Sequence, residues 1–268
     1  MGKFSGVLLA ADYDETLVAH DGSFPARNAE ALAYYTAEGG RFTLATGRGH
    51  APVKRLVAHL PINAPVIETN GTRIYDFAAG RELFAVTMPP EIREIVARLL
   101  KEYPALCIEC FAGDDIFSER PNFASEDHEH RIRQVIPERA MKTIPLPWTK
   151  LLLLEHHDYL LPLRDRLLAE YGDRYEIMFS MPDYLEIFPK GCSKGAALRK
   201  LGELLNLRHA DVYAVGDGDN DVSMLRDAGD SFCCANGSDA ARASAGHIVC
   251  SCDEGAIGDV IDWLDRKY

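Results

Sequence analysis

The chain has 268 residues, of which 47% are hydrophobic and 26% charged, and its formal net charge is −12. This composition is typical of a soluble globular protein with one large or two smaller domains, and the acidic balance argues against nonspecific binding to nucleic acid. Because the N-terminus lacks the apolar segment of a signal peptide and no apolar run approaches the length of a bilayer span, we expect a cytoplasmic protein with neither nucleic acid nor a membrane as partner.

The seven cysteines fit the reduced thiols of a cytosolic protein better than a disulfide framework. Two pairs, Cys107 with Cys110 and Cys250 with Cys252, have spacings that a zinc half-site could use. The first pair lies in an apolar run without turn residues, and the adjacent Cys233–Cys234 lies in a strand-like segment. We therefore predict that all of these cysteines are core residues rather than metal ligands.

The segment Val7–Leu17 begins with an apolar run and ends with Asp12, Asp14 and Thr16. The run predicts a buried strand, and in an open α/β sheet ligands bind at the carboxyl ends of the strands. Two acids one residue apart on an extended chain point the same way. At close range both ionise only when a cation or a shared proton intervenes. The alternative is a simple acidic turn at the end of a strand.

Helices and strands alternate after this segment. We predict, in chain order, a helix over 25–38, a strand over 41–45, a helix over 51–60, a strand over 65–68 and a hairpin formed by 73–77 and 82–86. The second strand leads into Thr46-Gly47-Arg48, and the third leads into Thr69-Asn70-Gly71. Short strands separated by helices are typical of a parallel sheet with crossover helices.

Residues 88–181 interrupt the alternation. Met88-Pro89-Pro90 and Met181-Pro182-Asp183 break the pattern, and we interpret them as linkers. Between them we predict helices over 91–103, 126–135 and 158–171 and strands over 106–111, 150–155 and 175–180. This α+β insert is expected to form a separate cap domain. Its histidines follow no metal-ligand spacing and are expected in solvated loops; they are His128, His130, His156 and His157.

The α/β pattern resumes after the insert. We predict strands over 184–188, 212–215, 231–235 and 247–249, and helices after 193, near 238–244 and from 254. Ser193 is a suitable N-cap for the first of these helices. The strand over 212–215 leads into the acidic segment 216–221. The simplest architecture is an α/β core formed by residues 1–87 and 182–268, with residues 88–181 inserted as the cap.

Several predicted strands of the core thus end in reactive side chains. Three carboxylates, those of Asp12, Asp217 and Asp221, call for a hard cation with oxygen ligands, which favours Mg²⁺. Phosphate oxygens can be held by Thr46, backbone N–H groups and Lys194. Cations are disfavoured at helix N-termini, so a local anion explains Lys194 better than an exposed position does. A carboxylate beside a metal can attack phosphorus and form an aspartyl phosphate.

These residues resemble the motifs of the haloacid dehalogenase superfamily of phosphotransferases, and in particular its Cof-type, class IIB branch. Its four motifs correspond, in order, to DYDET at 12–16, ATGR at 45–48, KGCSKG at 190–195 and GDGDND at 216–221. The TNG at 69–71 resembles the branch's loop on the substrate side. The resemblance covers the core on both sides of the insert and implies a Rossmann-like parallel sheet with an inserted α+β cap.

The resemblance also implies roles for individual residues. Asp12 would be the nucleophile, and Asp14 the general acid and later the base. Mg²⁺ would be held by Asp12, Asp217, the backbone carbonyl of Asp14 and, through water, Asp221. The phosphate and substrate would be bound by Thr46, Gly47, Arg48, Asn70, Gly71, Lys194 and Asn220. Glu15 departs from the pattern, because the family usually carries glycine there, and we expect it to point to solvent. Tyr13 is a candidate contact for the leaving group.

The sequence therefore predicts a Mg²⁺-dependent phosphatase that hydrolyses small phosphate monoesters, with sugar phosphates foremost, through an aspartyl phosphate. Its expected partner is a small phosphorylated metabolite. A phosphomutase or phosphotransferase differs only in the acceptor, and the motifs do not separate it from a phosphatase. A non-enzymatic phosphoacceptor signalling domain is an alternative from another class, although such domains are small and lack a large insert. Neither the substrate nor the oligomeric state follows from the sequence.

Overall fold

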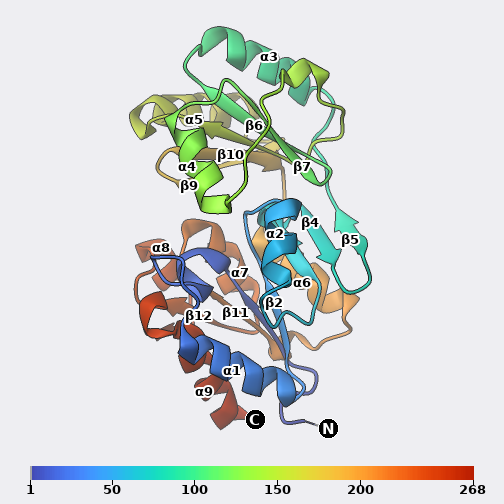
Figure 1. The fold of residues 1–268 in the computed structure, drawn as a ribbon, viewed down its shortest axis with the longest axis vertical. Helices are drawn as coiled ribbons and strands as arrows, with labels where there is room; N and C mark the ends of the chain where they lie inside the picture. Colours follow the sequence, from blue (N-terminus) through green and yellow to red (C-terminus); the bar gives the residue numbers. More distant parts are fainter. Residues whose placement is uncertain (1) are drawn as a thin grey trace. The chain divides into compact units, whose positions relative to one another are not determined.

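The computed structural model describes residues 2–268 (Figure 1), and these residues form two compact units. The first unit consists of the chain up to Gly47, Val57–Leu83 and Ser193–Tyr268. The second consists of Arg48–Leu56 and Phe84–Cys192. Within the described residues, no helix is both long and apolar enough to span a membrane.

A five-stranded parallel sheet forms the centre of the first unit, with the order β13-β12-β11-β1-β2. Its strands are β1 (Leu8–Ala11), β2 (Arg41–Leu44), β11 (Val212–Gly216), β12 (Asp230–Cys234) and β13 (His247–Val249). The apolar run before Asp12 becomes β1, an interior strand between β11 and β2, and all four of its residues are buried. Such continuous burial is expected of a parallel strand that is covered on both faces. The predicted α/β core is confirmed.

Helices from both ends of the chain cover this sheet. They are α1 (Ala26–Ala37), α6 (Lys194–Leu204), α7 (Val222–Asp227), α8 (Asp239–Arg242) and α9 (Ala256–Lys267). Helices α1 and α9 pack together, and so do α6 and α7. The predicted N-cap of α6 is confirmed, because the Ser193 hydroxyl oxygen accepts a hydrogen bond from the Ala196 N–H at 3.0 Å.

The strand predicted over 65–68 does not extend the parallel sheet in the way we expected. It is β3 (Val66–Glu68), and it pairs antiparallel with β4 (Arg73–Asp76) in a three-stranded sheet that β5 (Arg81–Ala85) completes. One isolated parallel bridge, Ala45 to Ile67, joins β3 to the end of β2. The cause is the segment 69–71, in which all three residues have positive φ and turn the chain straight back.

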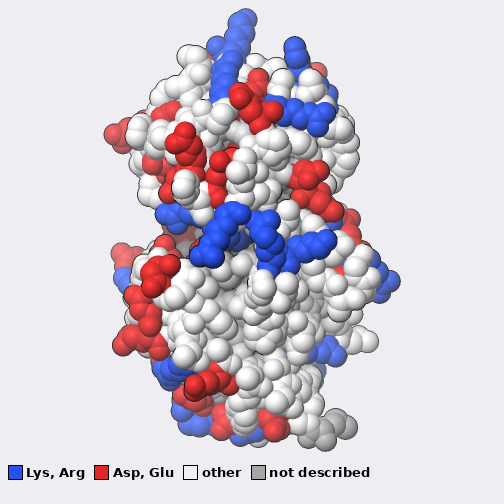
Figure 2. Space-filling view, in the orientation of Figure 1, with Lys and Arg blue, Asp and Glu red and all other residues white. Residues whose placement is uncertain are grey.

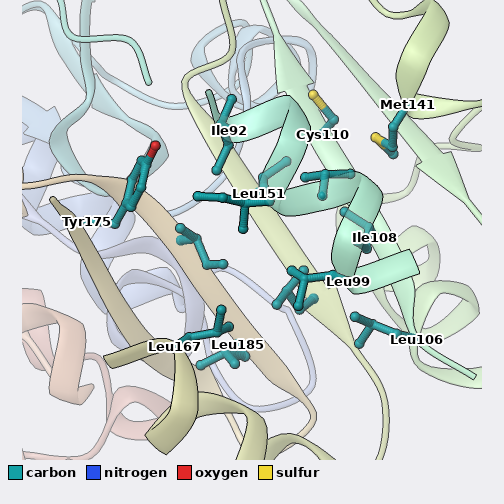
Figure 3. Close-up of a cluster of buried hydrophobic side chains, with 14 of the residues drawn as sticks. Ile92, Leu99, Leu106, Ile108, Cys110, Met141, Leu151, Leu167, Tyr175 and Leu185 are labelled. Atoms are coloured by element: carbon teal, nitrogen blue, oxygen red, sulfur yellow. The ribbon is translucent and has the colours of Figure 1, made fainter. Parts of the chain in front are cut away.

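The second unit is built on an antiparallel sheet with the order β7-β6-β8-β10-β9. Its strands are β6 (Cys107–Ala112), β7 (Asp115–Glu119), β8 (Lys150–Leu154), β9 (Tyr175–Met181) and β10 (Tyr184–Pro189), and its helices are α2 (His50–Val57), α3 (Ile92–Glu102), α4 (Phe123–Ile132) and α5 (His157–Tyr171). One face of the sheet packs against α3 and α5 through the apolar cluster of Figure 3, which includes Leu99 of α3, Leu151 of β8 and Leu167 of α5. Residues of α4 pack on the other face.

Three predictions about the second unit are wrong. The segment Met181–Asp183 is not a linker, because it joins the antiparallel strands β9 and β10 as a hairpin turn. The strand predicted over 184–188 therefore belongs to the second unit rather than to the core, and this unit runs to Cys192. His128 is not in a solvated loop, because it lies on α4, is buried, and has its Nδ1 2.6 Å from Oε2 of Glu109.

Candidate active site

Asp12 is placed at the edge of the sheet by β1. Its backbone N–H donates to the carbonyl of Val215 at 3.0 Å, so the parallel pairing of β1 with β11 continues one residue beyond the strand. The chain then enters a tight turn, Tyr13–Leu17, in which Glu15 has a φ of 56°. The Asn236 side chain donates to the Glu15 carbonyl at 2.9 Å and holds this left-handed turn. The turn keeps Asp12 and Asp14 at the carboxyl end of β1.

A second group of acids follows the neighbouring strand. After β11 the chain passes Asp217 and forms a 3₁₀ turn over Asp219–Asp221. One carboxylate oxygen of Asp221 accepts hydrogen bonds from the backbone N–H groups of Asp217, at 3.0 Å, and Gly218, at 2.9 Å. A Cβ atom at Gly216 would lie 2.6 Å from the Asp221 carboxyl carbon, so this packing requires glycine. Asp221 is thereby fixed in a fully buried position.

Lys194 joins the two groups of acids. Its Nζ lies 2.5 Å from Oδ1 of Asp12 and 2.6 Å from Oδ1 of Asp221, and the side chain is fully buried. Burial alone would favour the neutral amine, but the charges of Asp12 and Asp221 outweigh it and raise the pKa of Lys194. The predicted local anion beside this lysine is thus present, as two carboxylates.

Asp217 completes an acidic cluster with Asp12 and Asp221. Carboxylate oxygens of the three residues all lie within 4.8 Å of one another, and Asp217 accepts a hydrogen bond from the Thr16 hydroxyl. Burial, with help from the neighbouring acids, raises the pKa of Asp12 to about 7 and that of Asp217 to about 9. The carboxylates repel one another and are largely removed from solvent, so a cation would stabilise their ionised forms.

The donor set of this cluster fits Mg²⁺. Every candidate ligand is a carboxylate or carbonyl oxygen, which this hard ion prefers. When ionised, Asp12, Asp217 and Asp221 carry three negative charges, and Lys194 offsets one of them. The remaining two negative charges would be neutralised by one divalent cation.

Several of the residues predicted to hold phosphate or substrate lie just after β2 and in the turn after β3. Thr46 is buried; its N–H donates to the Ile67 carbonyl at 2.9 Å, and its own carbonyl accepts from the Asn70 N–H at 3.0 Å. A Cβ at Gly47 would lie 3.1 Å from Oδ1 of Asn70, and the Asn220 amide is 3.4 Å from the same oxygen. The first unit therefore brings together Thr46, Gly47, Asn70 and Asn220.

The family model for haloacid dehalogenase-like hydrolases matches residues 9–261, which span both groups of acids, Thr46 and Lys194. The chain belongs to this family. An HMP-PP phosphatase from Yersinia pestis is 33% identical over 221 residues, which are 81% of this chain and 80% of that protein. The match confirms the resemblance that the four ordered motifs indicated.

Solved structures of haloacid dehalogenase-like proteins have the same fold. A haloacid dehalogenase-like hydrolase from Bacteroides thetaiotaomicron superposes with a TM-score of 0.88 at 25% identity, over 96% of this chain and 99% of that one. A HAD subclass IIB sugar phosphatase superposes with a TM-score of 0.86 at 19% identity, over 97% and 99% of the two chains. At 19% identity, the second match shows that the two folds are alike and no more.

The unusual Glu15 has a geometric consequence in this haloacid dehalogenase-like chain. Its positive φ is a conformation that glycine adopts freely and that costs other residues about 1 kcal/mol. The turn thus gives a physical reason for the glycine that the resemblance led us to expect at this position. The Glu15 side chain is 43% exposed and has Oε2 3.8 Å from Nε2 of His20, in agreement with the expected outward direction.

Two predicted substrate residues have structural contacts of their own. Gly71 packs against the residue that precedes Lys194, since a Cβ there would lie 2.1 Å from the Ser193 carbonyl oxygen. Arg48 belongs to the second unit, where it donates to the Arg131 carbonyl at 3.0 Å. Lys and Arg side chains gather over α2, which follows Arg48 and carries Lys54 and Arg55 in its last turn (Figure 2).

Two residues that orient the site were not assigned these roles from the sequence. Thr16 was identified as part of the DYDET motif, but its bond to Asp217 spans 201 positions and has no local signal. Asn236 follows β12 and supports the Glu15 turn from 221 positions away. An asparagine just after a predicted core strand, at the edge that carries the acids, is the one signal that could have marked it.

Proposed function

We propose that this protein is a Mg²⁺-dependent phosphatase that hydrolyses small phosphate monoesters through an aspartyl phosphate on Asp12. The observation that carries the proposal is the buried Asp12 carboxylate, held 2.5 Å from the Lys194 ammonium within a cluster of three acids. Membership of the haloacid dehalogenase-like family supports it, as does similarity to an HMP-PP phosphatase. These similarities agree with the phosphatase activity that the sequence predicts.

In the proposed first step, an Asp12 oxygen forms a bond to phosphorus while the bond from phosphorus to the ester oxygen breaks. Asp14 donates a proton to the departing oxygen. Lys194, the Thr46 hydroxyl and the Gly47 N–H hold the oxygens of the phosphoryl group and stabilise the charge that spreads over them. In the second step Asp14 takes a proton from water, whose oxygen displaces Asp12 from phosphorus and releases inorganic phosphate.

Mg²⁺ would be held by the carboxylates of Asp12 and Asp217, the backbone carbonyl of Asp14 and, through water, Asp221. It would supply positive charge that lets a phosphate dianion approach a carboxylate nucleophile. The buried acids then stay ionised at neutral pH, although burial alone raises their pKa values.

In this proposal, residues of the second unit determine which substrate is bound. The first unit carries the residues proposed for the metal, nucleophile and phosphate, but these recognise only the group common to all phosphate esters. Related proteins are named as an HMP-PP phosphatase and as a sugar phosphatase, which makes both compound classes candidates. We keep sugar phosphates as the first expectation, with a small phosphorylated metabolite as the partner in either case.

A phosphate-release screen tests the proposal. Sugar phosphates, nucleotides, pyridoxal phosphate, HMP-PP and p-nitrophenyl phosphate are incubated with the enzyme and Mg²⁺. We expect many turnovers per chain on at least one substrate, whereas a phosphoacceptor signalling domain would release no more than its own phosphate. Asp12→Asn should stay folded and lose turnover, while Glu30→Gln, an exposed position on α1, should not. Near-normal activity of Asp12→Asn would refute the covalent mechanism.

A further inference from the structure

A second cluster of metal-binding side chains lies in the first unit, apart from the acids assigned above. It combines the thiol of Cys252, the imidazole of His20 and the carboxylate of Asp253. Nδ1 of His20 is 3.4 Å from the Cys252 sulfur and 2.9 Å from Oδ2 of Asp253. The sulfur is also 3.9 Å from Oδ1 of Asp253. The three ligand types thus meet at one point.

These distances are close to the edges of a tetrahedral metal site. Zinc binds thiolate sulfur at about 2.3 Å and imidazole nitrogen or carboxylate oxygen at about 2.0–2.2 Å. In a tetrahedron these bond lengths put neighbouring ligand atoms roughly 3.3–3.6 Å apart. The separation of 3.4 Å between the Cys252 sulfur and Nδ1 of His20 lies in this range. Oδ2 of Asp253 is 2.9 Å from that nitrogen, and the other oxygen, Oδ1, is 3.9 Å from the sulfur, so a rotation of the carboxylate would bring one oxygen within reach of an ion bound by the other two ligands.

The backbone around the three ligands is already fixed. Cys252 begins the 3₁₀ turn Cys252–Glu254, and Ser251 caps this turn by accepting from the Asp253 N–H at 3.3 Å. The Cys252 N–H donates to Oδ1 of Asn236 at 2.9 Å. The His20 N–H donates to Asp253 at 3.0 Å. The two segments that supply the ligands are thus held in register by bonds that do not use the ligand atoms of Cys252 or His20.

The chemistry of the donors selects the ion. A thiolate and an imidazole suit Zn²⁺ and related transition metals, whereas Mg²⁺ prefers oxygen alone. The cluster therefore differs from the all-oxygen group of Asp12, Asp217 and Asp221. Cys252 is buried, as we predicted from the sequence. The imidazole beside its thiol belongs to His20, which is 232 positions away in the chain.

We propose that His20, Cys252 and Asp253 bind one Zn²⁺-class ion, with the fourth position open to water. The ion joins the segment after the Asp12 turn to the segment before α9. Asn236 connects the two places directly, because its side chain contacts both the Cys252 N–H and the Glu15 carbonyl. The contrasting interpretation is a hydrogen-bonded His20–Asp253 pair beside an inert thiol.

Cobalt titration of the full chain in saturating Mg²⁺ tests the proposal. Co²⁺ replaces Zn²⁺ in tetrahedral sites, and a thiolate ligand gives a charge-transfer band in the near ultraviolet. We expect this band to saturate at one Co²⁺ per chain and to disappear when Zn²⁺ is added. Absence of the band from the unaltered protein would overturn the proposal.

Three variants locate the site. Cys252→Ser should abolish the band, and His20→Gln, at a half-exposed side chain, should weaken Co²⁺ binding at least tenfold. Cys250→Ser is the matched control, because Cys250 lies two positions away and is more exposed than Cys252, yet is not a ligand. It should keep the band. An unchanged band in His20→Gln or Cys252→Ser would refute the assignment.

Thermal unfolding gives a second measurement. An ion that binds only the folded chain raises its stability, so Zn²⁺ should raise the Tm of the unaltered protein and of Cys250→Ser in saturating Mg²⁺. The rise should be smaller in His20→Gln, because its binding of the ion is weaker. Circular dichroism establishes that each variant is folded, and should Cys252→Ser fail to fold, the His20→Gln comparison still decides. An equal rise in His20→Gln would count against the site.

Discussion

The Lys194 ammonium lies 2.5 Å from a carboxylate oxygen of Asp12, although 182 residues separate the two in the chain. The same nitrogen is 2.6 Å from Asp221, so one buried cation is shared by two buried anions. A buried ion pair is costly to form but more costly to break, because the remaining partner is left as an uncompensated charge. Lys194 therefore favours the ionised form of the Asp12 carboxylate, against the effect of burial, and also stabilises the fold around it.

Replacing this lysine should affect stability and activity together. Lys194→Met leaves Asp12 and Asp221 without their cation, and we expect the free energy of unfolding at neutral pH to fall by about 3–5 kcal/mol. Phosphate release should be lost. Lys190→Met, at a half-exposed side chain four positions earlier, should change the stability by less than about 0.5 kcal/mol. Urea unfolding without added metal measures both variants, and equal effects would contradict the role given to Lys194.

Phosphatase activity should require Mg²⁺, and the acids of the buried cluster should set the affinity for this ion. Chelation with EDTA should remove activity, and Mg²⁺ should restore it, because phosphate and three carboxylates need compensating charge. Asp217→Asn removes a proposed ligand and should raise the Mg²⁺ concentration for half-maximal activity at least tenfold. Asp219→Asn is the matched control, because Asp219 is exposed and hydrogen-bonded to Ser238. Activity that survives thorough chelation would exclude a catalytic metal.

Without metal, the protein should lose stability as the pH rises. The ordinary pKa of an aspartic acid is 3.8, but burial raises the pKa of Asp12 to about 7 and that of Asp217 to about 9. Between these values and 3.8 the folded state binds more protons than the unfolded chain, so its free energy of unfolding falls as pH rises. The contribution is complete below pH 3.8 and is lost by about pH 9.

Urea unfolding in EDTA across this pH window measures the effect. Other carboxyls contribute with the opposite sign, so the comparison is with Asp217→Asn, which no longer titrates at this position. The difference in unfolding free energy between the two proteins should change steadily from about pH 4 to about pH 9. Saturating Mg²⁺ should reduce the change. Parallel curves for the two proteins in EDTA would show that Asp217 does not titrate as described.

The positions of the acids could be predicted from local sequence because each follows an apolar run. The run before Asp12 and the run before Asp217 become the adjacent strands β1 and β11, and parallel strands end at the same edge. The sharing of Lys194 between Asp12 and Asp221 could not be predicted in the same way. It depends on how α6 packs, and no local periodicity encodes a contact across 182 residues.

The second unit shows where local signals mislead. Pro182 interrupts an apolar pattern just as a linker would, yet it lies in the turn between two strands that pair with each other. The sequence shows that a strand follows at 184 but not which sheet accepts it. His128 is flanked by charged residues and so indicates exposure, but α4 packs on the sheet and turns this one side chain toward Glu109. Pairing and packing, rather than propensity, decided both outcomes.

The role of Asp14 can be tested through the leaving group. A general acid matters most when the departing oxygen is strongly basic, because that oxygen then needs a proton as its bond to phosphorus breaks. Asp14→Asn keeps the side chain's size and the backbone carbonyl but cannot donate that proton. We expect its rate to fall about 10²–10⁴-fold on a sugar phosphate, and much less on p-nitrophenyl phosphate, whose leaving group hardly needs a proton. The rate of the first turnover on each substrate, measured by rapid quench, separates this step from later hydrolysis, and an equal loss on both esters would exclude Asp14 as the general acid.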